Sequence, residues 1–203
     1  MRVKREKSVD LVILDVAQDL VQRGGYNAFS YHDLADAIGI KTASIHYYFP
    51  TKGDLGKALM KRYTDTVREQ LSGIDTQTTD AARKLKLCAE MFAGSLCLDS
   101  GQLCMGCMLA SDLVTLPNDV QDEVRAFFAD LERWVSSVMR DGQAAGTLVY
   151  AGTPDKVARA FVAMLQGALI VARTLDVARQ PLETAAWFIA TITTHERDAL
   201  APR

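Results

Sequence analysis

The chain has 203 residues, of which 49% are hydrophobic and 24% charged, a composition typical of one or two compact domains. Its formal net charge of −2 would by itself argue against nucleic-acid binding. No apolar run reaches the ~20 residues of a membrane span, and acidic residues interrupt the apolar stretch near the N-terminus. We therefore expect a cytoplasmic protein with no signal peptide and no membrane partner.

The positive charge is concentrated at the start of the chain. Residues 1–71 carry 11 Lys and Arg against 9 Asp and Glu, whereas residues 72–203 carry 12 against 16. The excess gathers at Arg2, Lys4, Arg5 and Lys7. A mildly basic N-terminal part on an acidic remainder fits a small DNA-binding module joined to a body with another task.

The first predicted element is an amphipathic helix over Val9–Val21, where apolar residues recur at three- and four-residue intervals. Gly24-Gly25 ends it. A second helix begins at Ser30, where Asp33 completes a capping box three residues later, and it ends at Gly39. The spacing of these signals predicts two helices joined by a short irregular segment.

A third, short helix is predicted over Thr42–Tyr48, and Pro50 closes it. Thr51 and Asp54 then offer another capped start for a fourth helix, which we expect to end near Ser72-Gly73. Its apolar side connects the first three helices to the rest of the chain.

The second and third helices meet the requirements of a helix-turn-helix. That motif needs a small residue where the helices approach, a glycine to turn the chain and an apolar residue to hold the second helix. Ala35, Gly39 and Ile45 stand at these positions, and Ile40 would lie beneath the turn. The rest of the second helix of the motif is then free to face DNA, namely Lys41, Thr42, Ala43, Ser44, His46, Tyr47 and Tyr48.

The remaining chain also follows helical periodicity. After a polar linker at Thr76–Asp80 we expect helices at about residues 81–98, 104–113, 118–141, 154–178 and 181–195. With no persuasive strand pattern, the prediction is an all-α protein of about nine helices. A three-helix DNA-binding domain (1–52) would precede a larger helical bundle (53–203), with helix 53–72 connecting the two.

The stretch from Phe29 to Leu55 resembles the signature of the TetR family of bacterial regulators, and the likeness extends over residues 9–60. This resemblance implies base-edge reading by Lys41, Thr42, Ala43 and Ser44. It implies phosphate contacts by Ser30, His46, Tyr47 and Lys52, with Tyr31 and His32 close to the DNA backbone. We expect Tyr48 and Phe49 to pack inside the protein instead.

The family is dimeric, and one such module reads only a few base pairs. The resemblance therefore implies double-stranded DNA with a palindromic operator as one partner, and a homodimer through helices 154–178 and 181–195. The apolar positions that support this interface are Phe161, Leu165, Leu169, Trp187, Phe188 and Ile192. The alternative is that they only close the core of one chain.

The resemblance also implies a small-molecule effector, held in the second domain, whose binding releases DNA. Methionine adapts to irregular cavities. The candidate pocket residues are Met60, Tyr63, Cys88, Met91, Phe92, Met105, Met108, Phe127, Trp134 and Met164. Each of them could equally be ordinary core.

Four cysteines, Cys88, Cys97, Cys104 and Cys107, lie within 20 residues and are expected to be reduced thiols. The region of Cys107 resembles that of a subgroup of the family, some of whose members sense electrophiles or oxidants through a cysteine placed there. A helix N-terminus would stabilise the Cys107 thiolate, and Cys104 could resolve a sulfenic acid. Packing is the alternative, and a metal site would need Asp99 and Asp112 as further ligands.

Motifs of catalysis and cofactor binding are missing from the sequence. We find no nucleotide-binding glycine loop, nucleophile elbow or metal-binding helix motif. Of the histidines His32, His46 and His195, two fall inside the helix-turn-helix. We therefore expect a regulator without cofactors, metal or catalytic residues. The alternatives are a helical-bundle enzyme and an interaction module that binds no DNA.

Overall fold

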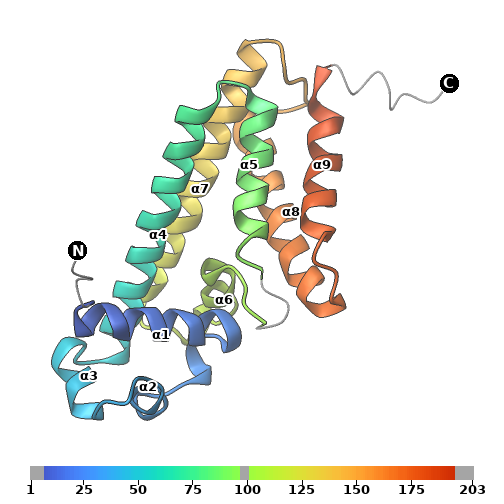
Figure 1. Ribbon diagram of the computed structural model, residues 1–203. Helices are drawn as coiled ribbons and strands as arrows, with labels where there is room; N and C mark the ends of the chain where they lie inside the picture. The colour runs from blue at the N-terminus through green and yellow to red at the C-terminus, as the bar shows by residue number, and fades with distance from the viewer. Residues whose placement is uncertain (1–6, 97–100, 195–203) are drawn as a thin grey trace, which may run out of the picture. The chain divides into compact units, whose positions relative to one another are not determined.

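The computed structural model describes residues 7–96 and 101–194 and is helical throughout these ranges (Figure 1). Within them no strand forms, and Leu148 and Thr193 make an isolated antiparallel bridge. The α-helices are α1 (Val9–Gly24), α2 (Tyr31–Ile38), α3 (Thr42–Tyr48), α4 (Lys52–Gln77), α5 (Ala81–Ala93), α6 (Met105–Ser111), α7 (Asn118–Ala144), α8 (Pro154–Leu175) and α9 (Gln180–Ile192). Two 3-10 helices, η1 (Tyr26–Ala28) and η2 (Leu113–Thr115), complete the set. The predicted all-α fold is confirmed.

Side-chain caps set the starts of two helices in the first part of the chain. At α2, the Asp33 backbone N–H donates to Ser30 Oγ at 3.3 Å and the Ser30 N–H donates to Asp33 Oδ2 at 2.7 Å. At α4, Thr51 and Asp54 make the same reciprocal pair, at 3.1 and 3.0 Å. Each cap satisfies backbone donors that a helix start leaves unpaired, which explains why both helices begin where the sequence predicts.

The end of α4 differs from the prediction. The helix continues through Ser72-Gly73 to Gln77, so the expected linker begins later. A glycine in a helix interior costs only about 1 kcal/mol, and the buried side chains of Leu71 and Ile74 on either side of Gly73 stabilise the helical path. Burial therefore outweighs the local helix-breaking signal.

Four other helices end before their predicted ends, and among them α6 ends at Ser111 and not near residue 113. Helix α5 ends at Ala93 and α8 at Leu175, where Asp176 adopts a left-handed conformation. Helix α9 ends at Ile192, and the predicted terminal residue His195 lies outside the described residues. Helices α5 and α8 end before residues that still continue the apolar pattern. Periodicity alone therefore overestimates the length of these two helices.

The contacts divide the chain into two compact units. The first combines the described residues up to Thr64 with Met105–Arg125, and within it α1 packs against α2, α3 and α6. The second combines Asp65–Cys104 with the described residues from Ala126 onward, and within it α9 packs against α5 and α8. Packing thus groups α6 with the helix-turn-helix, although it follows α5 in the chain.

The core of the second unit contains large aromatic and aliphatic side chains. Phe92, Phe127 and Phe161 are almost fully buried, and the Phe161 ring lies 5.5 Å from that of Phe188. Helix α8 is the one described helix long and apolar enough to cross a membrane. Core helices pass the same test, and the buried side of α8 packs against α9, which gives its composition a role inside the fold.

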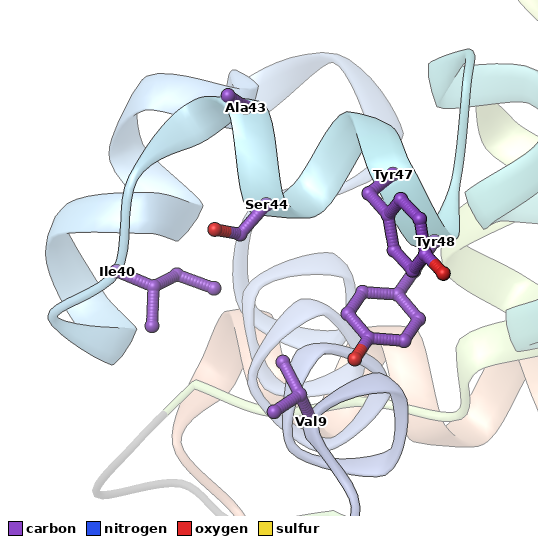
Figure 2. A pocket seen from close by; sticks show the side chains of 6 residues that line it. All are labelled: Val9, Ile40, Ala43, Ser44, Tyr47 and Tyr48. Carbon is purple, nitrogen blue, oxygen red and sulfur yellow. The ribbon is translucent and has the colours of Figure 1, made fainter.

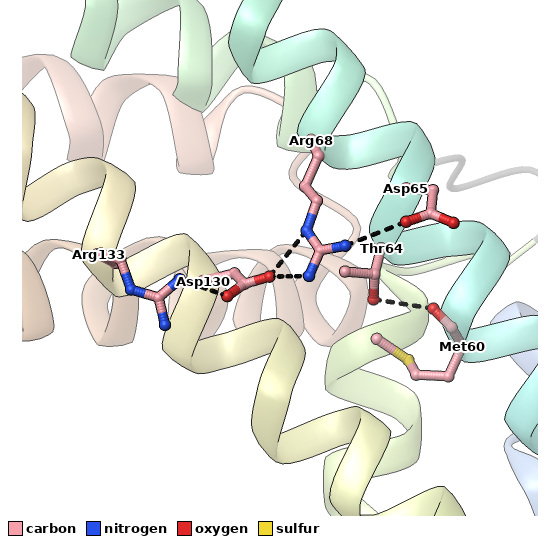
Figure 3. A network of polar contacts seen from close by, with 6 residues as sticks. All are labelled: Met60, Thr64, Asp65, Arg68, Asp130 and Arg133. Carbon is pink, nitrogen blue, oxygen red and sulfur yellow. Dashed lines mark hydrogen bonds and ion pairs between the residues drawn. The ribbon is translucent and has the colours of Figure 1, made fainter.

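Charged side chains join α4 to α7 in the second unit (Figure 3). Arg68 donates from Nε to Asp130 at 2.8 Å and pairs with Asp65 at 3.1 Å, and Arg133 pairs with Asp130 at 2.6 Å. Burial acts to raise the pKa of Asp130, but the two arginines outweigh it and lower that pKa overall. The carboxylate thus stays ionised between two cations.

Candidate DNA-binding site

The turn between α2 and α3 has the geometry that the motif requires. Gly39 has φ +80°, a left-handed conformation in which a side chain would be strained, and its N–H donates to the Ala35 carbonyl at 2.8 Å. The Ile40 N–H donates to the same carbonyl at 3.1 Å. Ala35 and Ile45 are buried as predicted, so the two helices are fixed against each other.

Helix α1 supports the motif from behind. Ile13, Ala17 and Val21 are completely buried, and α1 packs against both α2 and α3. Leu34 of α2 is also fully buried. Because these side chains leave one side of α3 uncovered, that helix presents the other residues to solvent.

The uncovered side of α3 carries the residues predicted to contact DNA. Lys41, Ala43, His46 and Tyr47 are exposed, whereas Thr42 and Ser44 are half-buried. Tyr47 is 81% exposed, an unusual environment for a large aromatic side chain in a folded protein. Phe49 is buried as expected, but Tyr48 is 40% exposed and lies against Tyr47, with ring centroids 5.1 Å apart, so it packs only in part.

An open hollow of about 420 Å³ lies on this side of the motif (Figure 2). Val9 of α1 lines it together with the two tyrosines of α3. Its full lining is Val9, Ile40, Ala43, Ser44, Tyr47 and Tyr48. Val9 could not be predicted to line a surface hollow, because an apolar residue at a helix start gives no signal of a surface role.

Tyr31 has partners inside the protein. Its side chain is buried, and its hydroxyl donates to the carbonyl oxygens of Phe49 at 2.9 Å and Thr51 at 2.6 Å. Burial raises the pKa of Tyr31, which keeps the hydroxyl protonated as a donor. Its ring meets His46 edge-on, with ring centroids 4.8 Å apart, and His46 Nδ1 lies 3.1 Å from the Pro50 carbonyl oxygen. These contacts hold the end of α3 to α2.

Lys52 is likewise engaged within the chain. Its ammonium donates to the Phe29 carbonyl and lies 4.7 Å from the ring centroid of Tyr26 and 4.3 Å from that of Phe29. Burial lowers the pKa of Lys52, while the negative charges of Asp33 and Asp112 act in the opposite direction. An ammonium over two rings is stabilised by cation–π attraction, so Lys52 also has a structural role beside its predicted phosphate contact.

The predicted dimer residues divide into two groups. Four of them are buried within the chain itself, namely Phe161, Leu165, Leu169 and Ile192. For these four the alternative holds, because they close the core of one chain. Phe188 is half-buried, whereas Trp187 is 65% exposed. Further exposed apolar residues on or next to these helices are Ile170, Val171, Leu175, Val177 and Leu182. An apolar surface therefore remains on α8 and α9, where Trp187 is joined by residues that were not among those predicted.

The predicted effector residues do not fall in one unit. Met60, Tyr63, Met105 and Met108 belong to the first, and Cys88, Met91, Phe92, Phe127, Trp134 and Met164 to the second. Seven are buried, and Met91, Trp134 and Met164 are half-buried. Trp134 Nε1 donates to Asp75 at 2.8 Å, and burial raises the pKa of Cys88 to about 12. The effector site stays a prediction.

A second hollow, of about 280 Å³, lies in the second unit on α7 and α8. Arg133, Arg140 and Arg159 line it together with Glu132 and Asp155. Arg159 pairs with Glu132 at 3.5 Å, and Ser136 donates to Asp155. Carboxylates thus offset most of the positive charge, which does not favour an anion-binding site.

The described cysteines have little access to solvent. Cys88 and Cys104 are completely buried and Cys107, the third residue of α6, is 7% exposed. A thiol must be accessible to react, so burial favours packing over redox sensing. Cys97 and Asp99 lie outside the described residues, as do Arg2, Lys4 and Arg5. Within the described residues no group of three His, Cys, Asp or Glu could hold a metal ion.

Two short helices fixed at a glycine turn, a supporting helix and an exposed polar and aromatic surface define a helix-turn-helix DNA-binding protein. Residues 13–59 match the family described as bacterial regulatory proteins, tetR family. The crystal structure of a TetR family transcriptional regulator from Agrobacterium tumefaciens has 33% sequence identity and a TM-score of 0.88, covering 91% of this chain and 97% of that one.

Two curated regulators are also similar over most of their length. Transcriptional regulator AcuR of Cereibacter sphaeroides is 26% identical over 166 residues, which are 79% of this chain and 74% of AcuR. HTH-type transcriptional repressor DhaR of Mycobacterium sp. is 25% identical over 179 residues, which are 83% of this chain and 87% of DhaR. The chain belongs to the TetR family and is a DNA-binding transcriptional regulator.

Proposed function

We propose that the protein is a cytoplasmic repressor that binds a palindromic operator as a homodimer and leaves it when a small molecule binds the part of the chain beyond residue 52. The observation that carries this proposal is the exposed surface of α3, above all Tyr47 at 81% exposure. The similarity to DhaR, a transcriptional repressor, supports repression over activation.

Within this proposal, Lys41, Thr42, Ala43 and Ser44 read base edges in the major groove. Ser30, His32, His46 and Tyr47 are exposed and contact phosphates. Tyr31 and Lys52 act on DNA mainly by holding α2, α3 and the start of α4 together, since their polar atoms have partners inside the chain. The recognition surface is thus smaller than the set of ten residues that the resemblance implies.

Dimerisation follows from the size of that surface. One helix-turn-helix contacts about one half-site, so a useful affinity needs two motifs on one DNA molecule. The exposed apolar side chains of α8 and α9, including Ile170, Leu175 and Trp187, supply a surface that a second copy would cover. The effector would bind among the apolar side chains of the part of the chain beyond residue 52.

Selection from a random double-stranded DNA library tests the proposal. The wild-type protein should enrich a palindrome with half-sites about one helical turn apart. The double variant Lys41→Ala/Tyr47→Ala should bind that palindrome about 10- to 100-fold more weakly, because two contacts of about 1 kcal/mol or more are lost. Lys86→Ala, an exposed lysine on α5, is the matched control for lost charge.

Enrichment of no sequence by the wild type would refute operator recognition. A reporter gene placed behind the selected palindrome separates repression from activation. Its transcription should rise when the regulator is deleted, and a fall would show an activator instead.

A further inference from the structure

The turn between α1 and α2 is held by residues far along the chain. The Tyr26 backbone N–H donates to Asp112 Oδ2 at 2.8 Å, and Asn27 Nδ2 donates to Thr115 Oγ1, also at 2.8 Å. All four residues belong to the first compact unit. Two hydrogen bonds therefore connect the entrance to the helix-turn-helix with the segment between α6 and α7.

The turn is shaped to admit the Asp112 carboxylate. Gly25 has φ +88°, and a Cβ placed on it would lie 2.8 Å from Asp112 Oδ2. Any other residue would be strained and would also collide with the carboxylate. The close approach of Asp112 to the Tyr26 N–H thus depends on a glycine at this position.

Asp112 and Thr115 are themselves fixed to each other. The Thr115 N–H and hydroxyl donate to the Asp112 carbonyl at 2.9 and 2.8 Å, so the hydroxyl that accepts from Asn27 is already oriented. Helix α6, which ends one residue before Asp112, packs against α1. The acceptors are therefore part of an ordered segment.

Lys52 contacts the same turn from the start of α4. Its ammonium donates to the Phe29 carbonyl and lies over the Tyr26 ring, while the Asp112 carboxylate attracts it electrostatically. Tyr26 is consequently buried. The residues just before α2 are held by α4 and by the α6–η2 segment together.

We propose that Asp112 is a positioning residue for DNA recognition. Through its bond to the Tyr26 N–H it fixes the path of residues 25–29, and hence where α2 begins and how α3 is presented, without touching DNA itself. The α6–η2 segment is then a working part of the DNA-binding unit. The inference rests on the proposed use of α3 to read the operator.

Three substitutions and one control test the role. Asp112→Ala removes the acceptor, Asp112→Asn keeps a carbonyl acceptor without the charge, and Thr115→Val removes the second hydrogen bond. Asp122→Ala, on α7, removes an exposed carboxylate that pairs with Arg125 at 2.9 Å and leaves the turn intact. Operator affinity, its salt dependence and amide hydrogen exchange of Tyr26 and α3 are measured for each, with circular dichroism to verify helix content.

Asp112→Ala should weaken operator binding about tenfold, the loss expected for one hydrogen bond to a charged acceptor. Asp112→Asn should lose about threefold or less, and Asp122→Ala, which removes a charge from the same unit, should bind as well as the wild type or slightly better. Removing a negative charge from a DNA-binding unit should, by charge alone, strengthen binding. The salt dependence should stay unchanged because no phosphate contact is lost, while the amides of Tyr26 and α3 exchange faster.

Wild-type operator affinity in Asp112→Ala would overturn the inference, and so would equal losses in Asp112→Ala and Asp112→Asn. Unchanged exchange of the α3 amides in Asp112→Ala would overturn it as well, even for a protein that binds no operator. Failure of the wild type to bind any operator refutes the proposed function instead, so the two failures are distinguishable.

Discussion

The two compact units use their side chains in different ways. In the first, short helices are held by specific polar contacts, such as the Ser30–Asp33 cap and the Asp112–Tyr26 bond, and one surface of α3 stays exposed. In the second, long helices bury large apolar side chains and leave another apolar surface open on α8 and α9. Polar groups held at fixed positions on a surface indicate which kind of ligand binds there. An exposed apolar surface indicates that something covers it, but it does not identify the partner.

The comparison predicts first that core truncation in the second unit has the largest effect on stability. Phe161→Ala should lower the free energy of unfolding by about 3–5 kcal/mol, because it leaves a cavity at a fully buried aromatic position. Denaturant titration measures this. Trp187→Ala, at an exposed aromatic on the neighbouring helix, is the control and should cost little in the isolated chain. A small loss for Phe161→Ala would mean that the second unit does not depend on this core.

The second prediction concerns assembly. Trp187→Glu should weaken the dimer by about 2–4 kcal/mol, because a charge would be buried at the centre of an apolar interface. Sedimentation equilibrium should show a shift from dimer toward monomer. Val114→Glu places the same charge at an apolar residue of the first unit that is 94% exposed, and it should leave the dimer intact. If Trp187→Glu and Val114→Glu dimerised equally well, the dimer interface would not include Trp187 of α9.

The third prediction compares caps in the two units. Ser30→Ala should destabilise the first unit by about 1 kcal/mol, because it removes half of a reciprocal cap. Thr153→Ala at α8 should cost less, since the Lys156 N–H lies 3.4 Å from the Thr153 hydroxyl and Pro154 already favours the helix start. Amide exchange in α2 and α8 measures the two effects separately. If Thr153→Ala lost more stability than Ser30→Ala, side-chain caps would matter more in the second unit than in the first, contrary to this prediction.

The smallest expected effect is a dependence on alkaline pH. Burial raises the pKa of Tyr26 to about 12, above its ordinary value of about 10 in an unfolded chain. The fold therefore favours the neutral phenol, and the stability it contributes is complete below about pH 10 and is lost as the pH rises toward 12. Unfolding titrations between these values should show a flatter decline for Tyr26→Phe than for the wild type. If the free energy of unfolding fell equally with pH in both proteins, Tyr26 would not be the group responsible for the decline.

Helix starts and the helix-turn-helix could be predicted because each depends on residues adjacent in sequence. Ser30 with Asp33 and Gly39 act locally, and the structure contains them as expected. The residues that cover α8 could not be predicted, because that helix is apolar on several sides and periodicity does not tell which side meets α9. Leu165 was assigned to an interface and is core, whereas Ile170 was not assigned and is exposed.

Within the DNA-binding motif, sequence resemblance predicted contacts with DNA for residues whose polar groups the fold already uses. Tyr31 and Lys52 match the family signature, yet their hydroxyl and ammonium groups bond to carbonyls inside the chain. Which partner a polar side chain takes depends on backbone groups about 20 residues away, and those distances are set only by the folded chain.

The bond between Tyr26 and Asp112 joins residues that are 86 positions apart. During synthesis, α1, α2 and α3 emerge long before the segment that completes their packing, which runs from Met105 to Arg125 at the first turns of α7. A fragment that ends at Thr64 would lack α6, η2 and their contacts with α1 and the turn. The first compact unit is therefore complete only after residues up to Arg125, more than half of the chain, have been made.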